Sequence, residues 1–207
     1  MNLVRRLLIL SLFLLVPLSS TASTINFDDL QETFDDPLPS PYAGFSWDNF
    51  RYFSFDDNAG FPTWQAAISS KPNAAYSGGT LGPDQIVGTF SRTTAFDFTS
   101  AYLGVVNYAT MNLTVQGWLG GVLKYSQVVS LDSNGADLFV FNFLNVDAVT
   151  LTGSINANDP CDFNCSQFTV DDIVYGRATQ TVPEPATVSL LGLGAAALWR
   201  ARRSRRS

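Results

Sequence analysis

Acidic side chains are the most numerous groups in this sequence that could take part in chemistry. The chain has 18 Asp and Glu residues and no histidine, so Ser-His-Asp or Cys-His hydrolysis lacks its base and ordinary zinc sites lack their imidazole ligand. Glycoside hydrolysis needs only two carboxylates, about 5 to 9.5 Å apart. Most of the aspartates, however, stand in turn-like contexts such as Asp35-Asp36 and Asp56-Asp57, where a short carboxylate bonds backbone amides. We therefore predict that the protein is not an enzyme, and a glycoside hydrolase or lyase is the least favoured alternative.

Two acidic pairs lie near the two ends of the central region. Asp28-Asp29 ends the first apparent strand, and Asp171-Asp172 lies inside the last one. First and last strands of jelly-roll sandwiches often run side by side, which would bring four like charges together unless a cation such as Ca²⁺ bridges them. This pattern resembles the structural calcium site of jelly-roll carbohydrate-binding modules, so Ca²⁺ is the one candidate cofactor. The alternative is that these acids face water at the edge of a strand.

Aromatic residues give a second binding signal. Six aromatics occur between Tyr42 and Phe53, and Trp64 and Tyr76 lie in a stretch, Asp56 to Pro83, that is rich in Gly, Ser, Pro and Asn and predicts a long loop. Flat aromatic faces beside Asn and Asp are suited to stacking on sugar rings. Trp64, Tyr76 and Trp47 are the candidate glycan-binding residues. The alternative for each aromatic is a place in the core.

The central region predicts an all-β fold. Residues 111–118 alternate apolar and polar side chains, Gly120-Gly121 follows, and 122–131 returns, which predicts a hairpin. Further strands are expected around 24–30, 45–55, 96–102, 139–144, 148–151 and 168–175. About nine short strands without a constant repeat indicate an antiparallel two-sheet β-sandwich of jelly-roll type.

The N-terminus has the three parts of a signal peptide. Arg5 and Arg6 precede an apolar run from Leu7 to Val16, which is too short to span a bilayer comfortably, and Ser20-Thr21-Ala22 offers a cleavage site. We predict a signal helix over residues 1–22, removed by signal peptidase near Ala22 or Ser23. The alternative is an uncleaved N-terminal anchor.

The C-terminus combines Pro183, Glu184 and Pro185 with an apolar stretch from 186 to 199 and five closing arginines. The prolines leave an extended peptide, the apolar stretch can form a short transmembrane helix, and the arginines stay on the cytoplasmic side. Residues 182–207 resemble the PEP-CTERM sorting signal of Gram-negative bacteria. That resemblance implies export, anchoring in the cytoplasmic membrane, and processing by an exosortase before release to the cell envelope or beyond. The alternative is a plain anchor that no enzyme cuts.

Export also bears on the two cysteines, Cys161 and Cys165. In an exported chain a disulfide between them is the expected state. It would close a small loop before the last strand.

The central domain, residues 23–181, is strongly acidic. It has five basic and seventeen acidic residues, a net charge of −12, which excludes a reader of nucleic acid because such proteins cluster Lys and Arg. We predict an exported, non-catalytic surface protein that binds extracellular polysaccharide. The alternative is a structural or adhesive envelope protein without specific glycan binding.

Overall fold

The computed structural model describes residues 22–78, 86–106, 110–155 and 167–178. One short helix and ten strands follow each other along this part of the chain: β1 (Ser23–Ile25), β2 (Asp36–Pro37), β3 (Ser46–Asp48), β4 (Phe50–Ser54), α2 (Pro62–Ala66), β5 (Asn73–Ser77), β6 (Ile86–Val105), β7 (Thr110–Leu119), β8 (Val122–Asp132), β9 (Asp137–Ile155) and β10 (Phe168–Arg177).

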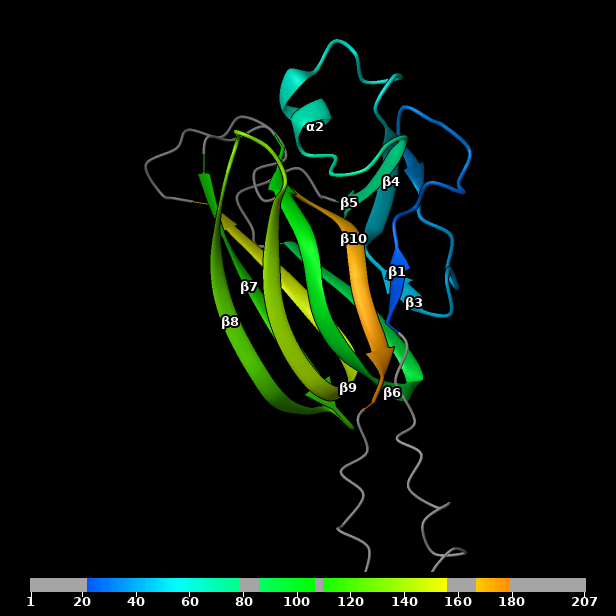
Figure 1. Ribbon diagram of the computed structural model, residues 1–207. Helices are drawn as coiled ribbons and strands as arrows, with labels where there is room; N and C mark the ends of the chain where they lie inside the picture. The colour runs from blue at the N-terminus through cyan, green and yellow to red at the C-terminus, as the bar shows by residue number, and fades with distance from the viewer. Residues whose placement is uncertain (1–21, 79–85, 107–109, 156–166, 179–207) are drawn as a thin grey trace, which may run out of the picture.

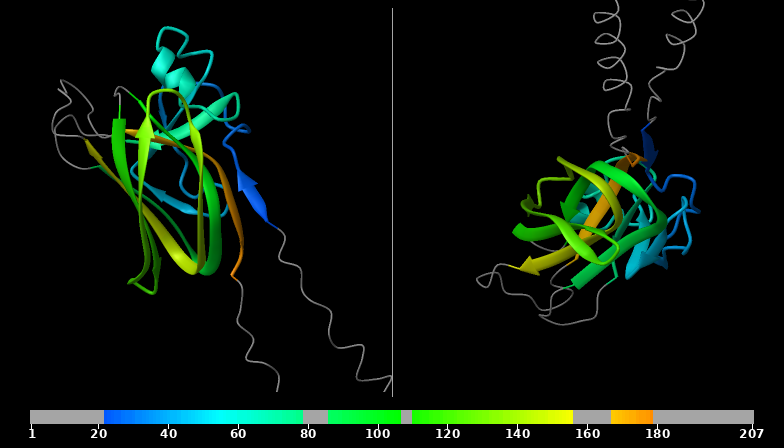
Figure 2. Two further views of the ribbon diagram at one scale, coloured as in Figure 1. Left: turned by 60° about the vertical axis from the view of Figure 1, so that its left-hand side comes forward. Right: turned by 90° about the horizontal axis from the view of Figure 1, so that it is seen from below.

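The strands form two antiparallel layers that share β6 and β9 (Figure 1, Figure 2). One layer contains β3, residues 86–91 of β6, residues 148–155 of β9, then β7 and β8. The other contains β2, β4, β5, β10, residues 96–105 of β6 and residues 137–146 of β9, with β1 on β10. The predicted all-β antiparallel sandwich of jelly-roll type is confirmed, and its two layers are parts of one continuous sheet.

The long strands β6 and β9 cross between the layers at irregular positions. Their pairing shifts register three times between Ser91 and Ser100, and Asn142 and Asn145 of β9 have positive φ angles of 51° and 55°. Extra residues of this kind bend a strand and increase its twist. The bends allow one strand to serve both layers.

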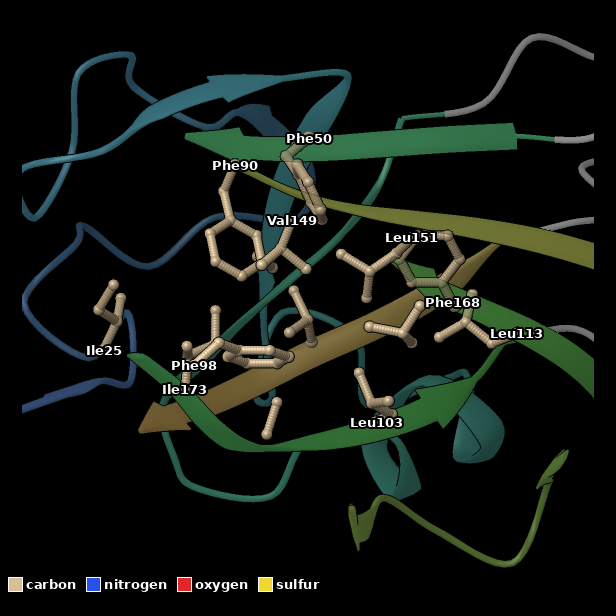
Figure 3. Close-up of a cluster of buried hydrophobic side chains, with 14 of the residues drawn as sticks. Ile25, Phe50, Phe90, Phe98, Leu103, Leu113, Val149, Leu151, Phe168 and Ile173 are labelled. Carbon is tan, nitrogen blue, oxygen red and sulfur yellow. The ribbon is translucent and has the colours of Figure 1, made fainter. Parts of the chain in front are cut away.

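Apolar side chains from both layers meet in one core (Figure 3). Phe90, Val149 and Leu151 come from one layer, and Phe98 and Phe168 come from the other. These five side chains are at most 1% exposed. At about 1.5 to 3 kcal/mol for each large apolar side chain removed from water, this core is the main stabilising contribution.

Several details depart from the sequence-based expectations. The 111–131 hairpin is confirmed as β7 and β8. The two strands expected at 139–144 and 148–151 are one strand, β9, and the loop expected over 56–83 contains α2 and β5. β9 stays paired with β6 across register shifts, so it continues through the polar residues that separate the two expected strands. α2 has only five residues, too few to show a helical period in the sequence.

The first described strand, β1, begins at the same end of the sandwich at which the last one, β10, finishes. Ser23 of β1 pairs with Tyr175 of β10, and this end of the sandwich lies opposite the segment that carries α2 (Figure 1). No helix among residues 22–78, 86–106, 110–155 and 167–178 is long and apolar enough to cross a membrane. The predicted signal helix and C-terminal transmembrane helix fall outside the described residues.

Candidate functional site

A pocket opens at the end of the sandwich where the 55–72 segment folds over β4 and β5. Its volume is about 240 Å³. It is smaller than a typical small-molecule site of about 300 to 1,000 Å³, and so suits one small chemical unit. The lining is made of four aromatic and three polar side chains: Phe34, Asp35, Asn58, Phe61, Trp64, Tyr76 and Gln167.

The aromatic lining has a fixed part and an exposed part. Trp64 of α2 packs edge-on against Phe53 and Tyr76, with ring centroids 5.0 and 5.2 Å apart. Phe34 and Phe61 meet edge-to-face at 5.9 Å and are 55% and 48% exposed. Large apolar side chains exposed together at the mouth of a pocket are a feature of binding sites.

The polar part of the pocket centres on Asp35. Its carboxylate accepts a hydrogen bond from the Tyr76 hydroxyl at 2.5 Å and another from Arg51 Nε, which also donates to the Tyr76 oxygen at 3.2 Å. The hydrogen bond to Asp35 raises the pKa of Arg51. Burial, together with the hydrogen bond to Asp35, raises the pKa of Tyr76. Tyr76 therefore stays a hydrogen-bond donor at neutral pH, and the Arg51 charge is directed at Asp35.

Backbone and amide contacts hold the pocket segments in place. Asn58 is 2% exposed and its Nδ2 donates to the carbonyls of Phe34 and Ser54, at 3.2 and 3.0 Å. Pro62 opens α2 without needing a backbone donor there. At its other end, the Ala67 carbonyl accepts from Thr169 Oγ1 of β10 at 2.8 Å. The segment that carries Phe61 and Trp64 is thus hydrogen-bonded to both β4 and β10.

Gly104 of β6 lets α2 approach the sheet closely. A Cβ at this position would lie 2.7 Å from Thr169 Oγ1 and 3.0 Å from the Ala67 Cβ. Any side chain at residue 104 would push the end of α2, and with it Trp64, away from the sheet.

The acidic pairs lie at a different place, under the same segment. Asp171 is fully buried, and its Oδ2 accepts from the backbone N–H groups of Ser69 and Ser70 at 3.1 and 2.8 Å. The Asp172 N–H donates to Asp171 Oδ1 at 2.8 Å. Burial, opposed by these hydrogen bonds and helped by the nearby Asp172 carboxylate, raises the pKa of Asp171 from 3.8 to about 7.

The pair on the first strand is also engaged by the protein. Asp28 accepts from Asn26 Nδ2 at 2.6 Å and from the Asn73 N–H at 3.5 Å, and Asp29 accepts from the Tyr42 hydroxyl. Desolvation raises the pKa of Asp28, and the Asp172 charge adds to the effect. β1 and β10 do run side by side, as expected.

These contacts bear on the calcium hypothesis. Over the described residues, no three Asp, Glu or Cys side chains are grouped closely enough to hold a metal ion. The four carboxylates instead accept hydrogen bonds from Ser69, Ser70, Asn26, Asn73 and Tyr42 or their backbone. Calcium binding by Asp28, Asp29, Asp171 and Asp172 stays a prediction.

The predicted glycan-binding aromatics divide into two groups. Trp64 and Tyr76 lie together in the pocket, although Tyr76 belongs to β5 and is only 3% exposed. Trp47 is not part of the pocket: it is 7% exposed and packs between Phe27 and Phe90 in the core, with its Nε1 donating to the Tyr42 carbonyl. It presents no face to a ligand, because alternation along β3 points it inward.

Sequence reasoning missed five pocket residues. Asp35 looked like a turn residue, and its link to Tyr76 spans 41 positions. For Phe61 the sequence offers one signal: Pro62 follows it, and proline is common at the first position of a helix, which places Phe61 at the N-cap of α2. No sequence pattern indicates that Phe34, Asn58 and Gln167 line a pocket. The predicted disulfide residues Cys161 and Cys165, and the motif residues Pro183, Glu184 and Pro185, lie outside the described residues.

The C-terminus matches a known sorting motif. Residues 181–206 match the PEP-CTERM protein-sorting motif. This agrees with the motif recognised in the sequence at Pro183, Glu184 and Pro185. The chain therefore has the tail of an exported protein that is sorted through this signal.

Solved structures share only distant similarity with the chain. A TmCBM61 structure in complex with β-1,4-galactotriose has 8% identity and a TM-score of 0.34, with 66% of this chain and 90% of that chain covered. The agarase AgWH50C has 5% identity and a TM-score of 0.41, covering 70% and 25%. The CBM51-2 and INT domains of ZmpB from Clostridium perfringens, in complex with GlcNAc, have 11% identity and a TM-score of 0.38, covering 76% and 32%. The chain thus spans about a quarter to a third of the latter two. No curated protein matches the sequence.

Proposed function

We propose that this protein is a non-catalytic, exported surface protein that binds one neutral sugar unit of an extracellular polysaccharide in the Trp64 pocket. The observation that carries the proposal is the pairing of exposed aromatic side chains with a hydrogen-bonded carboxylate in one small pocket. Stacking on the apolar face of a sugar ring and hydrogen bonds to its hydroxyls need these two kinds of group side by side.

The charge of the pocket favours a neutral sugar over an acidic one. Asp35 is the pocket's carboxylate, and the neighbouring guanidinium of Arg51 is directed at it. The domain as a whole has a net charge of −12, which repels anionic polymers at low ionic strength. Sugar hydroxyls, by contrast, are good donors to a carboxylate held in place by two other donors.

The same residues argue against hydrolysis. Glycosidases place two carboxyl groups across the scissile bond, whereas the lining of this pocket contains one, Asp35. That carboxylate already accepts from Arg51 and Tyr76. The arrangement is suited to holding a sugar rather than to protonating a leaving group.

The export signal and the position of the pocket fit this function. A PEP-CTERM tail sends the domain to the cell envelope, where extracellular polysaccharide is found. Trp64 of the pocket belongs to α2, which lies at the end of the sandwich opposite to the end where β1 begins and β10 finishes (Figure 1). A tether at that end would leave the pocket facing outward.

Calorimetric titration of the full-length chain in mild detergent tests the proposal. The panel contains neutral and acidic oligosaccharides, and the variants are Phe61→Ala and Phe34→Ala, which remove half-exposed rings without opening the core. Val122→Ala is the matched control, because it removes an apolar side chain, 66% exposed, on β8. We expect a neutral sugar to bind the parent and the control, and binding to weaken about tenfold or more in both Phe variants, as for loss of a stacking ring. No binding to any sugar by the parent chain would instead favour a structural or adhesive envelope protein.

A further inference from the structure

Exposed apolar side chains are concentrated on two strands of the described chain. Nine large apolar side chains among the described residues are exposed, and two of them, Phe34 and Phe61, belong to the pocket. Six of the other seven lie on just two strands, β8 and the first half of β9: Val122, Leu123, Val128, Leu138, Val140 and Leu144. Such a concentration marks an interaction surface.

Both of these strands are open edges. Within the described chain, β8 pairs along its length with β7 alone. Residues 137–146 of β9 pair with β6 alone, because β7 joins β9 only from Ala148 onward. Each layer therefore ends in a strand whose outward N–H and C=O groups can accept another strand.

The usual protection of an edge strand is sparse along β8. Its eleven residues contain no proline and one lysine, Lys124, which sits where the pairing with β7 shifts register. The remaining stretch, Gln127 to Leu131, carries no charge. A long, apolar edge of this kind is expected to be covered by another strand.

We propose that β8 pairs antiparallel with β8 of a second copy of this chain, about a two-fold axis at Val128. Opposite residues of an antiparallel pair must lie on the same face, so a self-paired strand has its axis at a residue and not between two residues. An axis at Val128 places residue 126 opposite residue 130 and residue 124 opposite residue 132. Isologous contacts of this type are the commonest way in which a chain forms a dimer.

Charge complementarity selects this register. Lys124 and Asp132 are the charged residues of β8, and only the axis at Val128 puts each opposite the other in the second copy. Lys124 Nζ donates to the carbonyls of Leu144 and Asn145, at 3.4 and 3.2 Å. An ammonium group has three donors, which leaves one for the Asp132 carboxylate of the second copy.

The central contact is apolar. Val128 is 63% exposed on the outer face of β8, opposite Thr114 of β7. In the dimer, each Val128 lies against its copy at a Cα separation of about 4.5 to 5.5 Å. The dimer would also extend the β7–β8 layer into one sheet across both copies.

Sedimentation of the full-length chain in detergent, with Val128→Lys and Val87→Lys, tests this pairing. Val87 is also exposed, at 44%, but lies on β6, away from the edge. We expect the parent and Val87→Lys to be dimers and Val128→Lys to raise the dissociation constant about tenfold or more, because like charges meet at the axis. A monomeric parent chain, or equal dimerisation of both variants, would overturn the proposal.

Cysteine cross-linking tests the register itself. Val128→Cys should form a disulfide-linked dimer on mild oxidation, because the two side chains face each other across the axis, and Val87→Cys should not. Circular dichroism shows that each variant is folded. Failure of Val128→Cys to cross-link, or equal cross-linking by Val87→Cys, would refute the β8–β8 pairing at Val128.

Discussion

The buried carboxyl of Asp171 makes the stability of the domain depend on pH. Its pKa is about 7 in the folded protein, above its ordinary value of 3.8, so the native state holds a proton that the unfolded chain has lost. The stabilisation is fully present below about pH 4 and is lost as pH rises through about 7. At 1.36 kcal/mol for each pH unit, the loss over this window is about 4 kcal/mol. Asp28, whose pKa is also raised by desolvation, acts in the same direction.

Asp171→Asn separates this effect from other carboxyl groups. The amide cannot ionise, but its NH2 group cannot accept a hydrogen bond, whereas both oxygens of Asp171 keep lone pairs even when the carboxyl is protonated, so a hydrogen bond from the N–H of Ser69, Ser70 or Asp172 is lost at about 1 kcal/mol. We expect the variant to be less stable than the parent at pH 4.5 and more stable at pH 8. The two curves of unfolding free energy against pH should cross between these values.

Urea unfolding monitored by circular dichroism at several pH values measures the crossing. Asp57→Asn is the control, since it changes an exposed acid, and it should keep the parent's slope. A parent whose stability is flat or rises between pH 4.5 and 8 would refute the reasoning, as would an Asp171→Asn variant with the same slope.

Two substitutions test the pocket, and a third, at Asn73, tests the hydrogen bonds that hold Phe27 and Leu30 beside β4 and β5. Gly104→Ala forces a Cβ within 2.7 Å of Thr169 Oγ1; urea unfolding should show a loss of about 1 to 3 kcal/mol, and an unchanged midpoint would mean that α2 is not tightly seated. Asn73→Ala leaves two backbone carbonyls and a buried hydroxyl without their partner, so the free energy of unfolding should fall by a similar amount; a change below measurement error would contradict it. Tyr76→Phe removes one of the two donors to Asp35 and should weaken sugar binding, measured by calorimetry, while circular dichroism stays unchanged; unaltered affinity would show that this hydrogen bond does not position the carboxylate.

The sequence predicted those parts of the fold that depend on local pattern. Alternation and a Gly-Gly turn fixed the β7–β8 hairpin, because the period of two in side-chain direction is visible in any strand with one buried face. The neighbouring first and last strands followed from the sandwich class. The continuity of β9 did not, because the irregularity at Asn145 interrupts the alternation between the strands expected at 139–144 and 148–151.

The site was only partly predictable, for a related reason. Trp64 was identified because it lies in a stretch without strand pattern, where an aromatic has no place in a sheet. Asp35 could not be identified, since its role depends on Arg51 and Tyr76, which reach it only through the pairing of β4 and β5. Trp47 does not line this pocket, because a run of aromatics does not reveal which of them face inward.

Fluorine NMR of the full-length chain labelled with fluorotryptophan tests the central claim most directly. The chain has four tryptophans, and Trp64→Phe assigns the resonance of Trp64. During titration with a neutral oligosaccharide that binds in calorimetry, the proposal predicts that the Trp64 resonance shifts and saturates while the resonance of the buried Trp47 does not. A Trp64 resonance that stays in place when the sugar is bound would contradict the proposal that this pocket is the sugar-binding site.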